Sequence, residues 1–340
     1  MALYPLKFVP RFVEKIWGGR KFADVLDKSM PAGQIGESWE LYDFPPGVMD
    51  KTDNWVSAQV ANGPLAGKTL HELVQTRRDE LCGHVELVNG EQFPILIKFL
   101  DAREDLSVQV HPDAEYCKQH PEAHLKTEAW YVMQNEPDAR ILVGLRDGVT
   151  KDAFENAIGD GSVESMIQSV KVKPGDCFFL RSGTIHALGA GILVAEVQTP
   201  SDTTFRVYDF KRVDPSTGKE RGLHVQQAMK VIDFSGKIEP KQERQHVASV
   251  HTTVTRLCTC EFFTMEKVRF MAGMQNDIPQ GEPMVWMMME GEAEIRTADL
   301  KEPITLKKGD TVLMPAVMDK PVLHTKTDCT WIETTFRSRR

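Results

Sequence analysis

The sequence lacks three features that would each point to a particular class of protein. No apolar run approaches the ~20 residues that a membrane helix needs, and the amino-terminal segment carries Lys and Arg among its apolar residues, unlike a signal peptide. There is no basic excess, because 41 Lys and Arg stand against 49 Asp and Glu, a formal net charge of -8. These absences argue against a membrane protein and against nucleic acid as a partner.

A disulfide framework is also missing. The sequence has six cysteines, and only Cys258 and Cys260 are close together, at a spacing that alternate residues of one strand explain. Scattered cysteines are typical of a reducing compartment, so we expect a cytoplasmic protein. The six positions are Cys82, Cys117, Cys177, Cys258, Cys260 and Cys329.

Short β-prone segments separated by turn residues dominate what is present. Helices are expected only at 70–81, where Thr69 and Glu72 have the spacing of a capping box, at 150–170, interrupted by glycines, and at 224–232. A polar stretch at 235–246 predicts a boundary near residue 240. The sequence therefore predicts a mainly β protein with a few covering helices.

A weak internal repeat relates the two parts of the chain. The segment 170–186 aligns with 304–320 through a shared Gly-Asp turn and the strand that follows, but Lys320 stands where the first copy has His186. A common hairpin turn is the alternative explanation. Together these patterns predict two jelly-roll barrels of the cupin type: residues 1–240 as a metal-binding catalytic domain with helical additions, and 241–340 as a degenerate domain without a metal site.

Four residues in strand-like segments could form one mononuclear metal site. Gln109 and His111 lie two apart in an alternating run, so both point to one face of a strand. Glu128 opens a second β-prone run, and His186 follows a Pro-Gly turn and an aromatic strand. Two imidazoles, a carboxylate and an amide suit Zn²⁺ or another divalent ion, one per chain. The alternative is chance, because ten histidines will bring some near carboxylates.

The segments around these residues resemble the type I phosphomannose isomerases in their short bacterial form. The resemblance rests on "KIWGGRKF", "GESWEL", "PILIKFLDAREDLSVQVHPD", "KTEAWYV" and "GTIHALGAGILVAEVQTPSDTTFRVYDF", within the first 240 residues. It implies a cupin enzyme that interconverts mannose 6-phosphate and fructose 6-phosphate, with Gln109, His111, Glu128 and His186 as the zinc ligands. One departure is Leu188, where long eukaryotic members have a tyrosine.

The resemblance also implies four pocket residues, Lys126, Glu196, Asp202 and Arg206. Aldose–ketose isomerisation opens the sugar ring and moves a proton between C1 and C2 through a cis-enediol(ate), which a metal ion would stabilise. Lys126, Glu196 and Asp202 are candidate proton carriers, with Lys126 preferred for ring opening or proton transfer and for contact with the substrate. Arg206 could stabilise the enediolate or bind the phosphate. Without the resemblance, structural roles would be favoured: a solvated strand-end charge for Lys126, a hydrogen-bond acceptor for Glu196, and a loop ion pair between Asp202 and Arg206.

Other functions remain open at this stage. A metal-dependent cupin oxygenase is disfavoured by the amide of Gln109 where an imidazole is usual. A non-catalytic sugar-binding cupin would not need the proton-transfer groups. A different sugar phosphate is a further alternative, because the residues that select the epimer cannot be identified from the sequence. A small-molecule sugar phosphate is the expected partner, and the expected assembly is a monomer or a weak homodimer.

Overall fold

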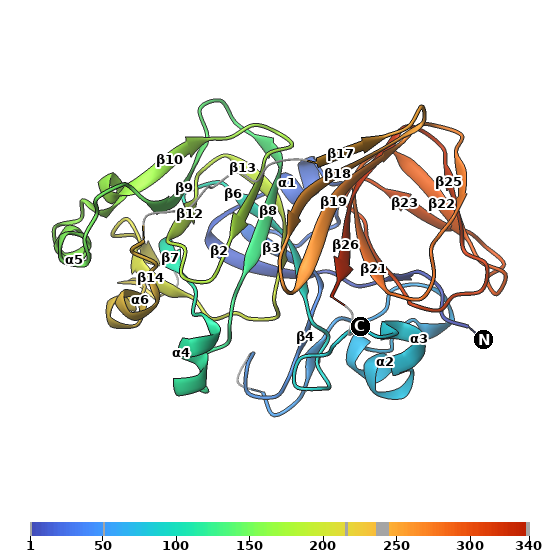
Figure 1. Cartoon of the computed structure of the whole chain (residues 1–340), viewed down its shortest axis with the longest axis horizontal. Coiled ribbons are helices and arrows are strands. Elements are labelled where there is room, and N and C mark those ends of the chain that lie inside the picture. Colours follow the sequence, from blue (N-terminus) through green and yellow to red (C-terminus); the bar gives the residue numbers. More distant parts are fainter. Residues whose placement is uncertain (1, 50–51, 215–216, 236–244, 338–340) are drawn as a thin grey trace.

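The computed structural model describes residues 2–49, 52–214, 217–235 and 245–337. Strands dominate this part of the chain, as predicted, and the helices are short (Figure 1). No helix among the described residues is long and apolar enough to cross a membrane. The domain boundary predicted near residue 240 lies outside the described residues, so the division into two domains stays a prediction.

Two sheets form the half of the molecule that contains the candidate site. A five-stranded sheet has the order β10-β9-β12-β7-β14, and a six-stranded sheet has the order β11-β8-β13-β6-β2-β3. The first comprises β7 (Val108–Val110), β9 (Arg140–Leu145), β10 (Ile167–Lys171), β12 (His186–Leu188) and β14 (Phe205–Tyr208). The second comprises β2 (Arg11–Gly19), β3 (Ile35–Leu41), β6 (Leu96–Ala102), β8 (Glu128–Asn135), β11 (Cys177–Leu180) and β13 (Ile192–Gln198).

The C-terminal strands form two further sheets, of seven and four strands. The amino-terminal β1 (Leu6–Lys7) joins the larger one, where Leu6 pairs with Leu313. The larger sheet also holds β17 (Gln245–Ala248), β18 (Thr252–Thr259), β19 (Phe263–Phe270), β21 (Met284–Glu290), β24 (Thr311–Met314) and β26 (Cys329–Phe336). The smaller one holds β20 (Gln275–Asp277), β22 (Glu292–Arg296), β23 (Ile304–Lys307) and β25 (Val322–Thr325). Two short hairpins pair β4 (Asp43–Phe44) with β5 (Val56–Ser57) and β15 (Val213–Asp214) with β16 (Lys219–Glu220).

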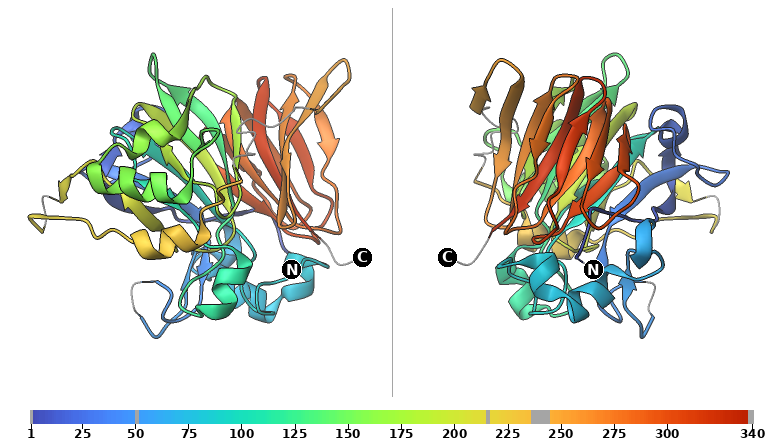
Figure 2. Two further views of the ribbon diagram at one scale, coloured as in Figure 1. Left: turned by 60° about the vertical axis from the view of Figure 1, so that its left-hand side comes forward. Right: turned by 90° about the vertical axis from the view of Figure 1, so that its right-hand side faces the viewer.

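Three apolar clusters separate these layers. One cluster lies between the five- and six-stranded sheets and includes Trp130, Ile141 and Leu188. A second packs the outer face of the five-stranded sheet against α5 (Lys151–Asp160) and α6 (Val225–Val231). The largest joins the other face of the six-stranded sheet to the C-terminal strands, which lie beside it (Figure 2). The central strands β6 and β13 of the six-stranded sheet are therefore buried along their whole length.

The helices agree with the sequence only in part. Thr69 caps α2 (Leu70–Thr76) in a reciprocal capping box with Glu72, but the predicted helix breaks at Arg77 and resumes as α3 (Arg78–Cys82). The helix predicted over 150–170 is wrong beyond Asp160, because Gly161 ends it with φ 84° and a 3-10 turn, η2 (Val163–Met166), leads into β10. The remaining helical segments are α1 (Lys21–Asp24), α4 (Ala114–Gln119), and η1 (Gly63–Leu65).

The two copies of the sequence repeat share one turn geometry. The carboxylate of Asp176 accepts a hydrogen bond from the backbone N–H of Lys173 at 3.0 Å, and that of Asp310 accepts from Lys307 at 2.8 Å. The intervening glycines have φ near 90°, a conformation that suits glycine. The strands β11 and β24 follow directly. The aligned sequences therefore fold alike, although a common hairpin turn would do the same.

Candidate metal centre and active site

Strand alternation aims the candidate ligands at the space between the two site sheets. In β7, Val108 and Val110 pack outward against the helices, so Gln109 faces inward. In β12, Ala187 packs outward and His186 faces inward. On the opposite sheet, Ala129 packs away from this space, and Glu128 faces into it from β8. Side chains from the two facing sheets thus meet in the space between them.

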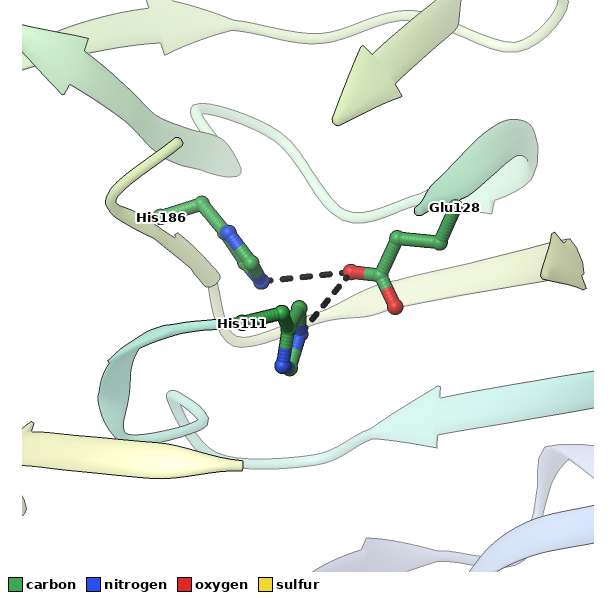
Figure 3. Close-up of side chains that lie close together, drawn as sticks. All are labelled: His111, Glu128 and His186. Atoms are coloured by element: carbon green, nitrogen blue, oxygen red, sulfur yellow. Dashed lines mark ion pairs between the residues drawn. The ribbon is translucent and has the colours of Figure 1, made fainter. Parts of the chain in front are cut away.

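Three of the four predicted ligands converge on one point (Figure 3). The Oε1 atom of Glu128 lies 3.2 Å from Nε2 of His186 and 3.6 Å from Nε2 of His111. One ligand atom from each residue fits within a 4.8 Å span. All three side chains are buried. This cluster is compatible with a single ion held by all three side chains.

Hydrogen bonds fix both imidazoles in the form that can bind a metal. Nδ1 of His111 lies 3.0 Å from the carbonyl oxygen of Thr203, and Nδ1 of His186 lies 2.8 Å from that of Thr184. A carbonyl only accepts, so each Nδ1 carries the proton and each Nε2 presents a lone pair. Buried Nε2 of His111 has no hydrogen-bond partner among the described residues. A buried polar atom without a partner is costly, and a cation would satisfy it.

Gln109 lies beside this cluster. It pairs in register with His186 across β7 and β12, and its Nε2 atom lies 3.4 Å from Nε2 of His186. Its Oε1 atom lies 3.3 Å from the hydroxyl of Ser107, which donates to it. The amide of Gln109 therefore borders the same space as the imidazoles, and its oxygen is the atom that would ligate a cation.

The charges of the cluster also suit a cation. Burial alone would raise the pKa of Glu128, but the ammonium of Lys126, 2.8 Å from Oε2, holds that pKa well below its usual value. Burial and the charge of Lys126 lower the pKa of His111 to about 3. At neutral pH the site therefore offers an anionic carboxylate and a neutral imidazole, the ligating forms of both groups. The donor set fits Zn²⁺ or a similar divalent ion.

A cavity of about 210 Å³ adjoins the cluster. Gln109 lies on its wall, together with all four predicted pocket residues, which are Lys126, Glu196, Asp202 and Arg206. Glu196 is buried on β13, where its Oε1 accepts a hydrogen bond from Nε1 of Trp130 at 2.8 Å. Burial and the nearby Glu128 raise the pKa of Glu196 to about 7. Asp202 is exposed at the cavity wall, in the connection between β13 and β14.

Arg206 is held from several directions. It pairs in register with Gln109 across β14 and β7. Its Nε donates to the hydroxyl of Ser107 at 3.3 Å and its Nη1 to the carbonyl of Gly222 at 3.1 Å. This guanidinium is therefore fixed next to the cluster of candidate ligands.

Comparisons with known proteins agree with this geometry. A sequence model described as the catalytic domain of type I phosphomannose isomerase matches residues 6–147. The mannose-6-phosphate isomerase ManA of Bacillus subtilis (strain 168) is 36% identical over 331 residues, which cover 97% of this chain and 98% of the relative. The chain belongs to the type I phosphomannose isomerase family.

Two more relatives support the membership. The mannose-6-phosphate isomerase of Streptococcus mutans is 34% identical and covers 92% of each chain. A crystal structure of the Bacillus subtilis mannose 6-phosphate isomerase matches with a TM-score of 0.85 at 33% identity, covering 97% of this chain and 99% of that one. The family suggested by the sequence motifs is thus confirmed, and with it the enzyme class, an aldose–ketose isomerase.

Four charged residues of the cavity wall were not among those selected from the sequence: Lys15, Glu37, Lys98 and Arg221. Three of them form a chain of ion pairs. Glu37 of β3 lies 2.9 Å from Nζ of Lys15 and 3.4 Å from Nζ of Lys98, and Lys98 lies 3.8 Å from Glu196. The sequence did contain a signal for Lys98, because "LIKFL" places this lysine between apolar residues of a β-prone segment. Although burial lowers the pKa of Lys98, the charges of Glu37 and Glu196 more than offset this and raise it.

Glu37→Gln is expected to lower the free energy of unfolding by about 3 kcal/mol at pH 7, since it removes the carboxylate that pairs with the buried ammonium of Lys98 and the partly buried one of Lys15. Burial would raise the pKa of Glu37, but Lys15 and Lys98 hold it far below its usual value. Because the pKa of Glu37 is lower in the folded than in the unfolded protein, its carboxylate stabilises the fold at pH values above the unfolded pKa of about 4.3. The difference in free energy of unfolding between the unsubstituted protein and Glu37→Gln should therefore stay constant from pH 7 to 5 and shrink below about pH 4.

Denaturant unfolding across this pH range is the measurement. Glu104→Gln is the matched control, because Glu104 pairs at 2.8 Å with Arg103 and both side chains are about half exposed. That variant should change the free energy of unfolding by less than about 1 kcal/mol. Equal changes in the free energy of unfolding for the two substitutions would show that the ion pairs of Glu37 stabilise the fold no more than an exposed pair does.

Proposed function

We propose that the protein is a zinc-dependent mannose-6-phosphate isomerase. The observation that carries the proposal is the convergence of His111, Glu128 and His186 beside a charged cavity, with each Nε2 free of its proton. Gln109 would complete the ligand set. Relatives that match over almost the whole chain are mannose-6-phosphate isomerases, which supports mannose 6-phosphate as the substrate and its ketose isomer, fructose 6-phosphate, as the product.

A divalent ion at this site would supply a Lewis acid that stabilises negative charge developing on the sugar oxygens. The chain's own residues supply the proton chemistry. Lys126 is buried at the cavity wall and lies 2.8 Å from Glu128, so its ammonium stands next to the ligand cluster. We assign to Lys126 a proton transfer, either in ring opening or between C1 and C2.

Glu196 and Asp202 are the other candidate proton carriers. Glu196 is held by Trp130 and Lys98, which restricts its carboxylate to one position at the wall. Asp202 reaches the same cavity from a loop and is open to solvent. Arg206 adds a fixed positive charge, which can stabilise an anionic intermediate or bind substrate. Lys126 and Glu196 are buried, and charges interact more strongly in such a site than in bulk water.

The alternatives find less support. A non-catalytic sugar-binding protein has no use for buried Lys126 and Glu196 beside the ligand cluster, because burying charge costs free energy. An oxygenase is disfavoured by family membership and by the amide of Gln109. A different sugar phosphate remains the second candidate, since the cavity would accept an isomeric substrate of the same size.

The test is a coupled isomerase assay with mannose 6-phosphate, glucose 6-phosphate and free mannose, with bound metal quantified. We expect turnover of mannose 6-phosphate, little of the other two, and about one metal ion per chain. EDTA should abolish the activity and Zn²⁺ should restore it, because the proposed chemistry needs a Lewis acid. Full activity in metal-free protein would refute the metal-dependent function, and preference for glucose 6-phosphate would favour the second candidate.

A further inference from the structure

Three guanidinium groups gather around one buried carboxylate near the cavity. Arg221 donates to Asp209 through both Nε and Nη2, at 2.6 and 2.5 Å. Arg212 donates from Nη2 to the same carboxylate at 2.5 Å. Arg206 lies close enough for its charge to interact with those of Arg212, Arg221 and Asp209. Three cations face a single anion, so the cluster carries an excess of positive charge.

Arg206 and Arg221 both line the active-site cavity, whereas Arg212 does not. Burial and the charges of Arg221 and Arg212 lower the pKa of Arg206, which reports repulsion between like charges. The carboxylate of Asp209, with 5% of its side chain exposed, forms ion pairs with both Arg212 and Arg221. Among the described residues, Nη1 of Arg221 has no hydrogen-bond acceptor. Two guanidinium groups on one cavity wall thus have donor capacity left for an anion.

The chain holds Asp209 in place with an unusual turn. Phe210 and Lys211 both have positive φ, 55° and 53°, a conformation that costs free energy in residues other than glycine. The turn is closed by a hydrogen bond from the N–H of Arg212 to the carbonyl of Asp209 at 3.1 Å. It brings the Arg212 guanidinium back onto the Asp209 carboxylate. The tight bidentate pair then fixes the orientation of Arg221.

We propose that Arg221, with Arg206 beside it, binds the phosphate group of the substrate. The inference rests on the proposed function. Arg206 lies in register with the candidate ligand Gln109, whereas Arg221 is held by Asp209, beyond the end of β14. A sugar with C1 and C2 at the ligand cluster carries its C6 phosphate elsewhere in the same cavity, whose wall both arginines line. Planar guanidinium groups match the dianionic phosphate in both charge and geometry.

The experiment compares Arg221→Gln with Arg221→Lys and with Lys211→Asn. Lys211 lies in the same turn and is not on the wall of the active-site cavity, so its loss removes the same charge without removing a proposed phosphate contact. Asparagine also tolerates the positive φ at that position. Thermal melting of all variants checks that each is folded.

Two measurements decide the outcome. In steady-state kinetics, Arg221→Gln should raise KM for mannose 6-phosphate by about 10- to 100-fold with kcat within about threefold, because a charged hydrogen-bonding group is lost from binding. Arg221→Lys should recover part of the loss, and Lys211→Asn should stay within about threefold. Separately, binding of inorganic phosphate to EDTA-treated protein, followed by ³¹P NMR, should weaken at least tenfold in Arg221→Gln alone.

The two measurements separate this inference from the proposed function. Unchanged KM and unchanged phosphate binding in folded Arg221→Gln would overturn the role of Arg221 while leaving isomerase activity standing. Equal losses of substrate affinity and phosphate binding in Arg221→Gln and Lys211→Asn would also overturn it, since the overall positive charge near the cavity would then explain the binding without a contact from Arg221. Phosphate binding that depends on Arg221, in a protein that does not isomerise mannose 6-phosphate, would support the anion site and refute the proposed substrate pair.

Discussion

His186→Ala is expected to remove the bound metal and to lower kcat/KM for mannose 6-phosphate by about a thousandfold. The substitution deletes one of two imidazoles whose Nε2 atoms face Oε1 of Glu128. Loss of an electrostatic stabiliser of developing charge commonly costs about 3 to 4 kcal/mol of barrier, which corresponds to two to three powers of ten in rate. Metal content by elemental analysis and the coupled assay measure the two effects.

The sequence repeat provides a matched control for this prediction. Lys320 occupies the position aligned with His186 but is exposed in the C-terminal part, and Lys320→Gln should retain both metal and activity. His186→Leu keeps more of the side-chain volume than alanine, offers no ligand atom, and should behave like His186→Ala. A folded His186→Ala protein that still carries one metal ion per chain and turns over normally would remove this residue from the site.

Lys126→Met is expected to lower kcat by about 100- to 10,000-fold while the metal stays bound. General acid–base groups contribute rate factors of this order. The ammonium of Lys126 lies 2.8 Å from Oε2 of Glu128 and so competes electrostatically with any cation at that carboxylate. Its removal should leave metal affinity equal or higher, whereas loss of a ligand would lower it. Metal content therefore separates the proton-transfer role from ligation.

Lys118→Met is the control for this substitution. Lys118 is on α4, 73% exposed, and paired only with Glu115 of the same helix turn among the described residues. Its replacement should leave kcat within about twofold. A rate for Lys126→Met that matches this control would exclude Lys126 from proton transfer and direct attention to Glu196 and Asp202.

Local sequence patterns predicted some elements because the interactions that form them are local. The capping box at Thr69 and Glu72 involves residues three apart, and it begins a helix as expected. The stretch beyond Gly161 shows the limit of such patterns. Residues 167–170 read as helical from their spacing, but they belong to β10, which forms by pairing with β9. Only Ile167 of this strand is buried, so the strand depends on its backbone pairing with β9 more than on burial of its side chains.

The candidate ligands could be selected from the sequence because strand alternation places Gln109 and His111 on one face and family motifs surround all four residues. The network of Glu37, Lys98 and Lys15 could not, because it depends on which strands become neighbours. Lys98 of β6 pairs in register with Glu196 of β13, almost a hundred positions away. Nothing local in either segment specifies that register. The same holds for Arg221, whose role depends on a loop returning to Asp209.

The mainly β composition, the family and the residue types able to bind a metal and move protons could be predicted from the sequence, because they depend on local pattern and side-chain chemistry. Three properties could be seen only in the folded chain: His111, Glu128 and His186 meet at one point, backbone carbonyls set both imidazole tautomers, and Arg221 reaches the cavity. Those properties arise from the packing of two sheets face to face, where the side chains that meet are fixed by long-range strand pairing rather than by separation along the chain.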